Sequence, residues 1–109
     1  MNNRRLAALF GFVLVATGLV GLTHAPSPMS SATPYDLFHI AFGAIGIACS
    51  VGRRGSKAFN IGFGAIDLYQ ALAQQLGWFP ADWFLWKSAD LILHVGIGAL
   101  LVGVGFSLD

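Results

Sequence analysis

The chain contains no glutamate, and its five acidic residues are all aspartates. Only 10% of the 109 residues are charged, whereas 56% are hydrophobic. A soluble domain of this size carries about a quarter charged residues, and its surface helices need polar faces. The shortage of charge therefore excludes an ordinary water-soluble helical domain and predicts that lipid surrounds most of the chain.

Cysteine is equally scarce, because Cys49 is the only one and lies within an apolar run. A disulfide framework and a cysteine-based metal site within the chain are therefore excluded, and we interpret Cys49 as a small packing residue. The formal net charge is +1, and the longest basic tract is Arg53–Arg54, which gives no indication of nucleic-acid binding. Phosphate loops, nucleophile elbows and metalloprotease helices are also absent, so we expect no enzyme.

Four apolar stretches cover residues 6–22, 35–51, 58–76 and 89–108. Each is near the lower length limit for crossing a bilayer as a helix, and the alternation typical of strands is absent. The first stretch resembles a signal peptide, but Pro26 would follow the cleavage site, so we expect this stretch to be retained. The sequence predicts one all-α domain over residues 1–109, a bundle of four transmembrane helices.

The basic residues indicate the orientation of this bundle. They precede the first stretch or fill the second loop, residues 52–57, whereas the first loop has none and the third loop has only Lys87. The positive-inside rule then places both termini in the cytoplasm, and we expect the protein in the bacterial inner membrane. Aromatic residues crowd the third loop, residues 77–88, and predict a turn in the outer headgroup layer, either as a membrane belt or as a ligand cage: Trp78, Phe79, Trp83, Phe84 and Trp86.

The second and fourth stretches repeat one pattern without gaps. Residues 37–44 align with residues 92–99, and His-x-x-x-Gly-Ala occurs in both, with the histidines at His39 and His94. The first and third stretches show a weaker echo, in which Ala7, Gly11 and Phe12 match Ala58, Gly62 and Phe63. We infer a duplicated helical hairpin, whose two copies insert in the same direction around a pseudo-twofold axis along the membrane normal.

Small residues spaced four apart indicate where these helices pack, because lipid gives apolar faces no reason to associate. The sequence holds four such pairs: Ala7 with Gly11, Ala44 with Ala48, Ala58 with Gly62, and Ala99 with Gly103.

These motifs resemble those of a family of small bacterial membrane proteins with four spans and no known activity. The matching residues are Asp36-Leu37-Phe38-His39 with Gly43, and Ser88-Ala89-Asp90 with His94 and Gly98. The resemblance covers nearly the whole chain and implies a fold and a membrane location. Asp67 departs from it, because the family is apolar or aromatic there, which raises the question of an additional contact.

Polar residues inside the predicted spans are the candidate site residues. Asp36 and Asp90 lie about one turn from His39 and His94, and we expect them to bond the histidines or to cap their helices. Alternatively, His39 and His94 ligate one haem b, or one of them ligates a chlorophyll-type magnesium.

Asp67 lies close to the middle of the third span, where a charged carboxylate is costly. It belongs to a polar stripe that lines the bundle interior, meets another protein, or relays protons or ions: Asn60, Gly64, Asp67, Gln70 and Gln74.

From these features the sequence favours a non-catalytic accessory or structural subunit of a larger membrane complex of respiratory or photosynthetic type. The first alternative is a haem- or pigment-binding membrane protein. The second is a minimal transporter or channel.

Overall fold

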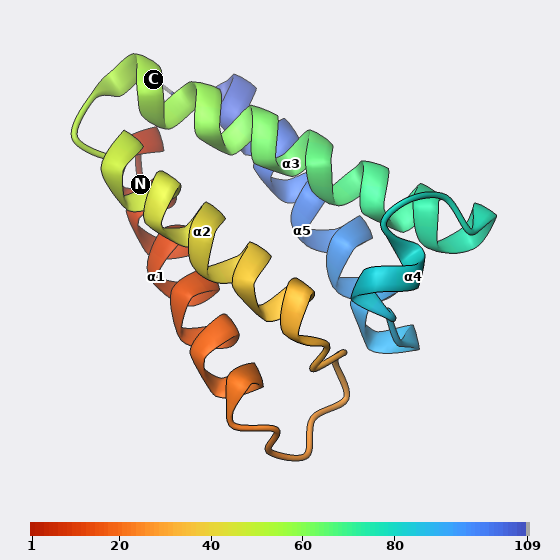
Figure 1. Cartoon of the computed structure of the whole chain (residues 1–109). Helices are drawn as coiled ribbons and strands as arrows, with labels where there is room; N and C mark the ends of the chain where they lie inside the picture. The colour runs from red at the N-terminus through yellow and green to blue at the C-terminus, as the bar shows by residue number, and fades with distance from the viewer. Residues whose placement is uncertain (109) are drawn as a thin grey trace.

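The computed structural model describes residues 1–108 and is all-helical over that range. Its elements are α1 (Asn3–Leu22), α2 (Thr33–Cys49), α3 (Arg53–Leu76), the short α4 (Ala81–Phe84) and α5 (Ser88–Ser107). The long helices form two antiparallel hairpins, α1 with α2 and α3 with α5 (Figure 1). Helix α3 also packs against α1 and α2 and so joins the hairpins. The all-α class predicted from the sequence is confirmed.

Helix α3 begins at Arg53, so the loop predicted over residues 52–57 is wrong. Gly52 is the N-cap, and the hydroxyl of Ser56 in the first turn donates to Gly52 O at 2.5 Å and to Cys49 O at 3.0 Å. Arginine and lysine are good helix formers, and their charge alone had suggested a loop. The basic residues therefore lie on the first turns of a helix.

Helix α1 also begins earlier than the predicted residue 6. The side chain of Asn2 accepts a hydrogen bond from Arg5 N at 2.9 Å, which satisfies one of the free amides of the first turn. At the other end of α3, Gly77 adopts φ +70° as the C-cap, a conformation that glycine enters without steric cost.

Each hairpin crosses at a pair of glycines. A Cβ on Gly11 would lie 2.8 Å from Gly43 O, and one on Gly43 would lie 2.6 Å from Gly11 O. In the second hairpin, a Cβ on Gly64 or on Gly98 would lie 2.9 Å from the carbonyl oxygen of the other. The backbones thus touch at equivalent points in both hairpins, as small residues allow between membrane helices.

The positions of the crossing glycines correct the weaker alignment between the first and third apolar stretches that the sequence had suggested. Gly11 corresponds to Gly64, which makes the equivalent crossing, whereas a Cβ on Gly62 would have nothing within 4 Å. Of the four small-residue pairs, only Ala7 with Gly11 is buried at a helix contact; the other three face outward: Ala44 with Ala48, Ala58 with Gly62, and Ala99 with Gly103. When every face of a helix is apolar, spacing alone does not say which face turns inward.

Polar and hydrophobic side chains are distributed differently from those of a soluble protein, in which few polar side chains are buried. The buried residues include as many polar or charged side chains as hydrophobic ones, while large hydrophobic side chains are exposed along all four long helices. By length and composition, α1 and α5 could each cross a membrane, and only 22% and 28% of their apolar windows are buried. An apolar helix in a soluble core would be mostly buried, because the exposed area is what water disfavours.

Both termini lie at one end of the bundle, called here the termini end (Figure 1). Asn60 Nδ2 donates to Asn3 Oδ1 at 2.8 Å, and Asn3 Nδ2 donates to Gly105 O at 3.2 Å. These bonds join α1, α3 and α5 at that end. The opposite end, called the loop end, holds residues 23–32 and 77–87.

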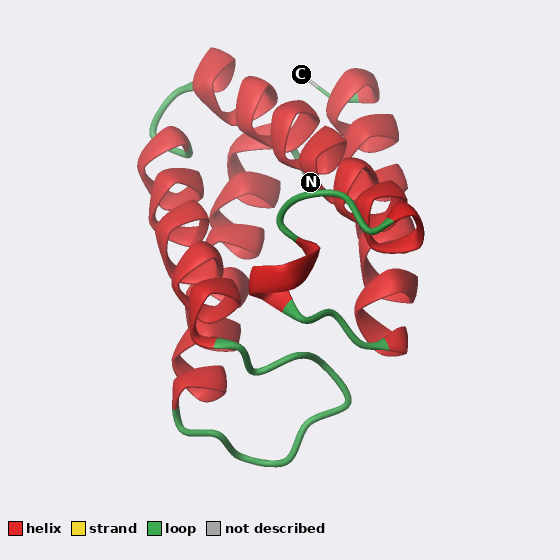
Figure 2. Ribbon diagram, turned by 45° about the vertical axis from the view of Figure 1, so that its right-hand side comes forward, coloured by secondary structure: helices red, strands yellow, loops and turns green. Residues whose placement is uncertain are grey.

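The segment around α4 folds back into the loop end of the bundle rather than lying wholly on its surface (Figure 2). Phe84 is buried, with its ring centroid 5.1 Å from that of Tyr35 and 5.2 Å from that of Phe38. Trp78, Phe79 and Trp83 are exposed. The predicted surface turn is therefore wrong for Phe84, which packs against Tyr35 and Phe38 of α2.

We predict that Gly64→Ala destabilises the fold while Gly62→Ala, two residues away on the same helix, does not. The added methyl at position 64 meets a backbone carbonyl, and overpacking of this kind costs about 1–3 kcal/mol. At position 62 the methyl meets nothing, and alanine is the better helix former. Thermal unfolding in detergent should show a lower midpoint for Gly64→Ala only; equal midpoints for the two variants would contradict the glycine crossing.

A polar cavity between the two hairpins

A cavity of about 170 Å³ lies among the four long helices in the loop-end half of the bundle. Five polar side chains contribute to its lining: Thr17 from α1, Tyr35 and His39 from α2, Asp67 from α3, and His94 from α5. Three of them, His39, His94 and Asp67, are candidate residues that the sequence had singled out on different helices. The structure brings them to one place, and we treat this cavity as the candidate functional site.

Tyr35 connects the two hairpins at this cavity. Its hydroxyl donates to Asp90 Oδ1 at 2.9 Å and lies 2.9 Å from His94 Nε2. Because the single hydroxyl proton goes to Asp90, the Tyr35 oxygen accepts from His94, whose Nε2 therefore carries hydrogen. The ring of Tyr35 also contacts that of His39, with centroids 4.1 Å apart. One buried tyrosine thus orients both histidines.

Asp90 is fully buried and fully bonded. Besides the Tyr35 hydroxyl, it accepts from Ser30 N at 2.8 Å and from Lys87 N at 2.9 Å, both on Oδ2. The bond to Lys87 closes the first turn of α5, as an acidic residue at the third helical position often does. A carboxylate with three donors fixes the first loop, α2 and the start of α5 relative to one another.

The equivalence between the repeats places Tyr35, not Asp36, opposite Asp90. Tyr35 lies four residues before His39, and Asp90 lies four residues before His94, so each shares a helical face with its histidine. Asp36 lies only three residues before His39 and has no counterpart carboxylate in the second hairpin. The bond between Tyr35 and Asp90 therefore joins equivalent positions across the pseudo-twofold axis.

Asp67 is 4% exposed and accepts a hydrogen bond from Gln70 Nε2 at 3.2 Å. Its counterpart in the first hairpin is Leu14, because Leu14 follows the crossing glycine Gly11 by three residues, as Asp67 follows Gly64. Leu14 lines the same cavity. At these equivalent positions the cavity wall is therefore apolar in the first hairpin, at Leu14, and acidic in the second, at Asp67.

The rest of the predicted polar stripe also turns inward. Asn60 is buried in the termini-end bonds with Asn3, and Gln70 is 2% exposed beside Asp67. Gln74, at the end of the stripe, is half-buried and donates to Lys87 O at 3.0 Å. Asn60, Asp67 and Gln70 therefore do not present a polar surface to another protein.

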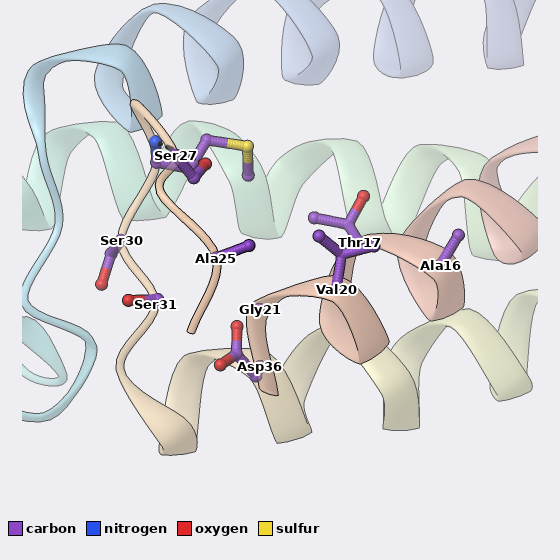
Figure 3. A pocket seen from close by; sticks show the side chains of 10 residues that line it. Ala16, Thr17, Val20, Gly21, Ala25, Ser27, Ser30, Ser31 and Asp36 are labelled. Carbon is purple, nitrogen blue, oxygen red and sulfur yellow. Dashed lines mark hydrogen bonds between the residues drawn. The ribbon is translucent and has the colours of Figure 1, made fainter. Parts of the chain in front are cut away.

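Asp36 lines a second hollow, of about 310 Å³, between the end of α1, the start of α2 and the first loop. Figure 3 shows Thr17 and Val20 from α1, Asp36 from α2 and the loop serines around this space. Asp36 is 1% exposed, and its Oδ2 has no hydrogen-bond partner. A Cβ on Gly21 would collide with this carboxylate, so the glycine makes room for it.

Sequence reasoning missed Tyr35 and Ser30, which hold Asp90 in place. A signal for Tyr35 was present, because the gapless alignment that pairs His39 with His94 also pairs Tyr35 with Asp90. No signal could have identified Ser30, since its amide acts through the backbone and its position depends on how the first loop folds.

A tetrapyrrole does not fit this interior. Pockets for ligands of drug size have volumes of about 300–1,000 Å³, whereas the cavity beside His39 and His94 has about 170 Å³. His94 Nε2 is also engaged with Tyr35.

We predict that Tyr35→Phe destabilises the protein and that Tyr69→Phe, at the other tyrosine of the chain, does not. Removing the Tyr35 hydroxyl takes one hydrogen bond from Asp90 and one from His94, both of which stay buried. Each buried polar group that loses its partner lowers the free energy of unfolding by about 1–3 kcal/mol. The Tyr69 hydroxyl donates to Phe79 O at an exposed position, where water can replace it. Thermal unfolding in detergent measures both, and a Tyr35→Phe midpoint equal to the wild-type value would refute the bridging role.

We also predict that the protein purified in detergent from its native cells shows neither a Soret band nor a red chlorophyll band in its absorption spectrum. The cavity volume is the reason, since neither macrocycle has room between His39 and His94. A Soret band that disappears in His94→Ala would show that the interior widens to take haem.

Comparison of the chain with protein-family models, with curated proteins and with solved structures finds no match in any of the three.

Proposed function

We propose that the chain is an integral membrane protein of four spans that serves as a non-catalytic subunit of a larger membrane complex. The observation that carries this proposal is the outward position of small residues that contact nothing within the chain. On α5, a Cβ at Gly96 or at Gly103 would have no neighbour within 4 Å, and the same holds for Gly62 on α3.

A membrane position for all four long helices is supported by their outward faces and lengths. Helix α2 has 17 residues and α3 has 24, which correspond to about 25 and 36 Å at 1.5 Å per residue. Both have exposed hydrophobic side chains, such as Ile45 on α2 and Leu72 on α3. Their buried polar groups point to the bundle interior, as expected of polar residues inside a bilayer.

The distribution of basic residues supports cytoplasmic termini in this proposal. Arg4 and Arg5 on α1 and the basic residues at the start of α3 belong to the termini end, while Lys87 alone belongs to the loop end. The positive-inside rule favours the termini end as the cytoplasmic side. We propose the bacterial inner membrane on the same grounds.

The partner that we propose is a transmembrane helix of another protein, packed on the outward small residues of α5. Ala99 lies between Gly96 and Gly103 on that helix, and all three are exposed. Close backbone approach is what such residues provide in membranes, where van der Waals packing replaces the hydrophobic effect as the driving force.

A channel is disfavoured, because the apolar core closes the termini-end half of the bundle with Leu6, Phe59 and Leu101.

We predict that the wild-type protein, extracted in mild detergent, migrates on native electrophoresis with another membrane protein and well above its own mass of 11.5 kDa. Gly103→Leu should weaken this association about tenfold, because a new side chain of this kind costs about 1–3 kcal/mol in a tight interface. Val95→Leu, at an exposed position of α5 that is already large, is the control and should leave the association intact.

Two results would contradict this proposal. Migration of the wild-type chain as a lone monomer would exclude a stable partner. A larger species that contains only copies of this chain would show that the outward face of α5 serves self-association instead.

A further inference from the structure

The cavity between the hairpins adjoins the hollow at Asp36. Thr17 and Met29 belong to the lining of both spaces, so the two spaces meet at these side chains. The hollow at Asp36 lies against the first loop at the loop end of the bundle (Figure 3). Together the two spaces lead from the loop end, past Thr17 and Met29, to Asp67.

This path ends inside the bundle. Phe63 and Leu14 line the cavity and also belong to the apolar core, which continues toward the termini end with Leu6, Phe59 and Leu101. The next polar side chain of the stripe on α3 is Asn60, seven residues or about 10 Å before Asp67, and Asn60 bonds Asn3 instead. Neither space therefore extends past these core residues toward the termini end.

The charge and bonding of the walls favour protons as the species that enters. Neither lining includes a lysine or an arginine, and each includes one aspartate, Asp36 or Asp67. The buried atoms Asp36 Oδ2, His39 Nδ1 and His94 Nδ1 have no hydrogen-bond partner in the protein, and such atoms in native proteins call for water or an ion. A cavity of about 170 Å³ has room for several water molecules.

From this arrangement we propose that the two spaces form a one-sided, hydrated path by which protons from the loop end reach Asp67. A hydronium ion at the end of the path gives its proton to the Asp67 carboxylate, so that a neutral carboxyl group and water remain. The groups that surround this site are Thr17 on α1, Tyr35 and His39 on α2, Gln70 on α3, and His94 on α5. Asp chains with histidine serve as proton routes in other membrane bundles.

The proposal rests on the membrane position proposed above, and cysteine accessibility to Ag⁺ in sealed membrane vesicles of either orientation tests both. All variants carry Cys49→Ala, which removes the native thiol. Ser31→Cys in the first loop and Ser107→Cys at the end of α5 report the two sides, and Asp67→Cys reports the end of the path. Thiols that remain after Ag⁺ treatment are counted with a maleimide dye in denaturant.

We expect Ag⁺ added at the loop side to consume the thiols of Ser31→Cys and Asp67→Cys, and Ag⁺ at the termini side to consume only that of Ser107→Cys. Adding Thr17→Phe, which fills the passage between the two spaces, should protect the Asp67→Cys thiol. Thr17→Val is the control of matched size and should leave that thiol reactive. Thermal unfolding of the Thr17→Phe variant confirms that protection reflects a filled passage in a folded protein.

The outcomes separate the two proposals. If both side reporters react from either side, the chain does not span the membrane as proposed. If the reporters keep their sides while Asp67→Cys reacts from neither side or from both, the membrane position stands and the one-sided path is refuted. Unchanged reactivity in a folded Thr17→Phe variant would refute the route past Thr17.

Discussion

The crossing of each hairpin on a glycine pair is the contact on which the rest of the structure depends. In the membrane position that we propose, apolar helices gain nothing from burying more apolar surface, so close packing has to hold them together. Gly11 with Gly43, and Gly64 with Gly98, bring backbones into contact that any side chain would separate. Each repeat histidine lies four residues before the glycine of its own helix and therefore on the same face. The crossing thus sets the depth of His39 and of His94 in the bundle.

Once the hairpins are formed, the polar side chains on their facing surfaces need hydrogen-bond partners from the opposite hairpin. The two hairpins supply equivalent positions in pairs, and these positions hold complementary groups. Tyr35 and Asp90 occupy equivalent sites and bond each other, which two tyrosines or two carboxylates would do less well. Leu14 and Asp67 are likewise equivalent and line one cavity. The equivalent positions of the two hairpins thus form an interior with one polar wall, which is where the candidate site lies.

The inward position of the α3 stripe also changes how the surface is understood. A polar strip facing outward would have been the simplest docking site for another membrane protein, but Asn60, Asp67 and Gln70 are buried. The outward faces offer apolar and small residues instead, so recognition there has to rest on shape. Buried polar groups thus gather in the bundle interior, while small and large apolar residues lie on the outward faces of the helices.

The sequence by itself determined that the chain is helical, where its four long apolar segments lie to within a few residues, and that His39 and His94 are equivalent. Those features follow from composition, from turn residues and from a gapless repeat, all of which are local. Only the tertiary structure decided which small residues touch, that Tyr35 bridges Asp90 to His94, and that Arg53 begins a helix. The reason is physical: helical spacing tells which residues share a face, but where all faces are apolar it does not tell which one turns inward. That choice is made by the polar groups of facing helices, which find their partners only when both hairpins are in place.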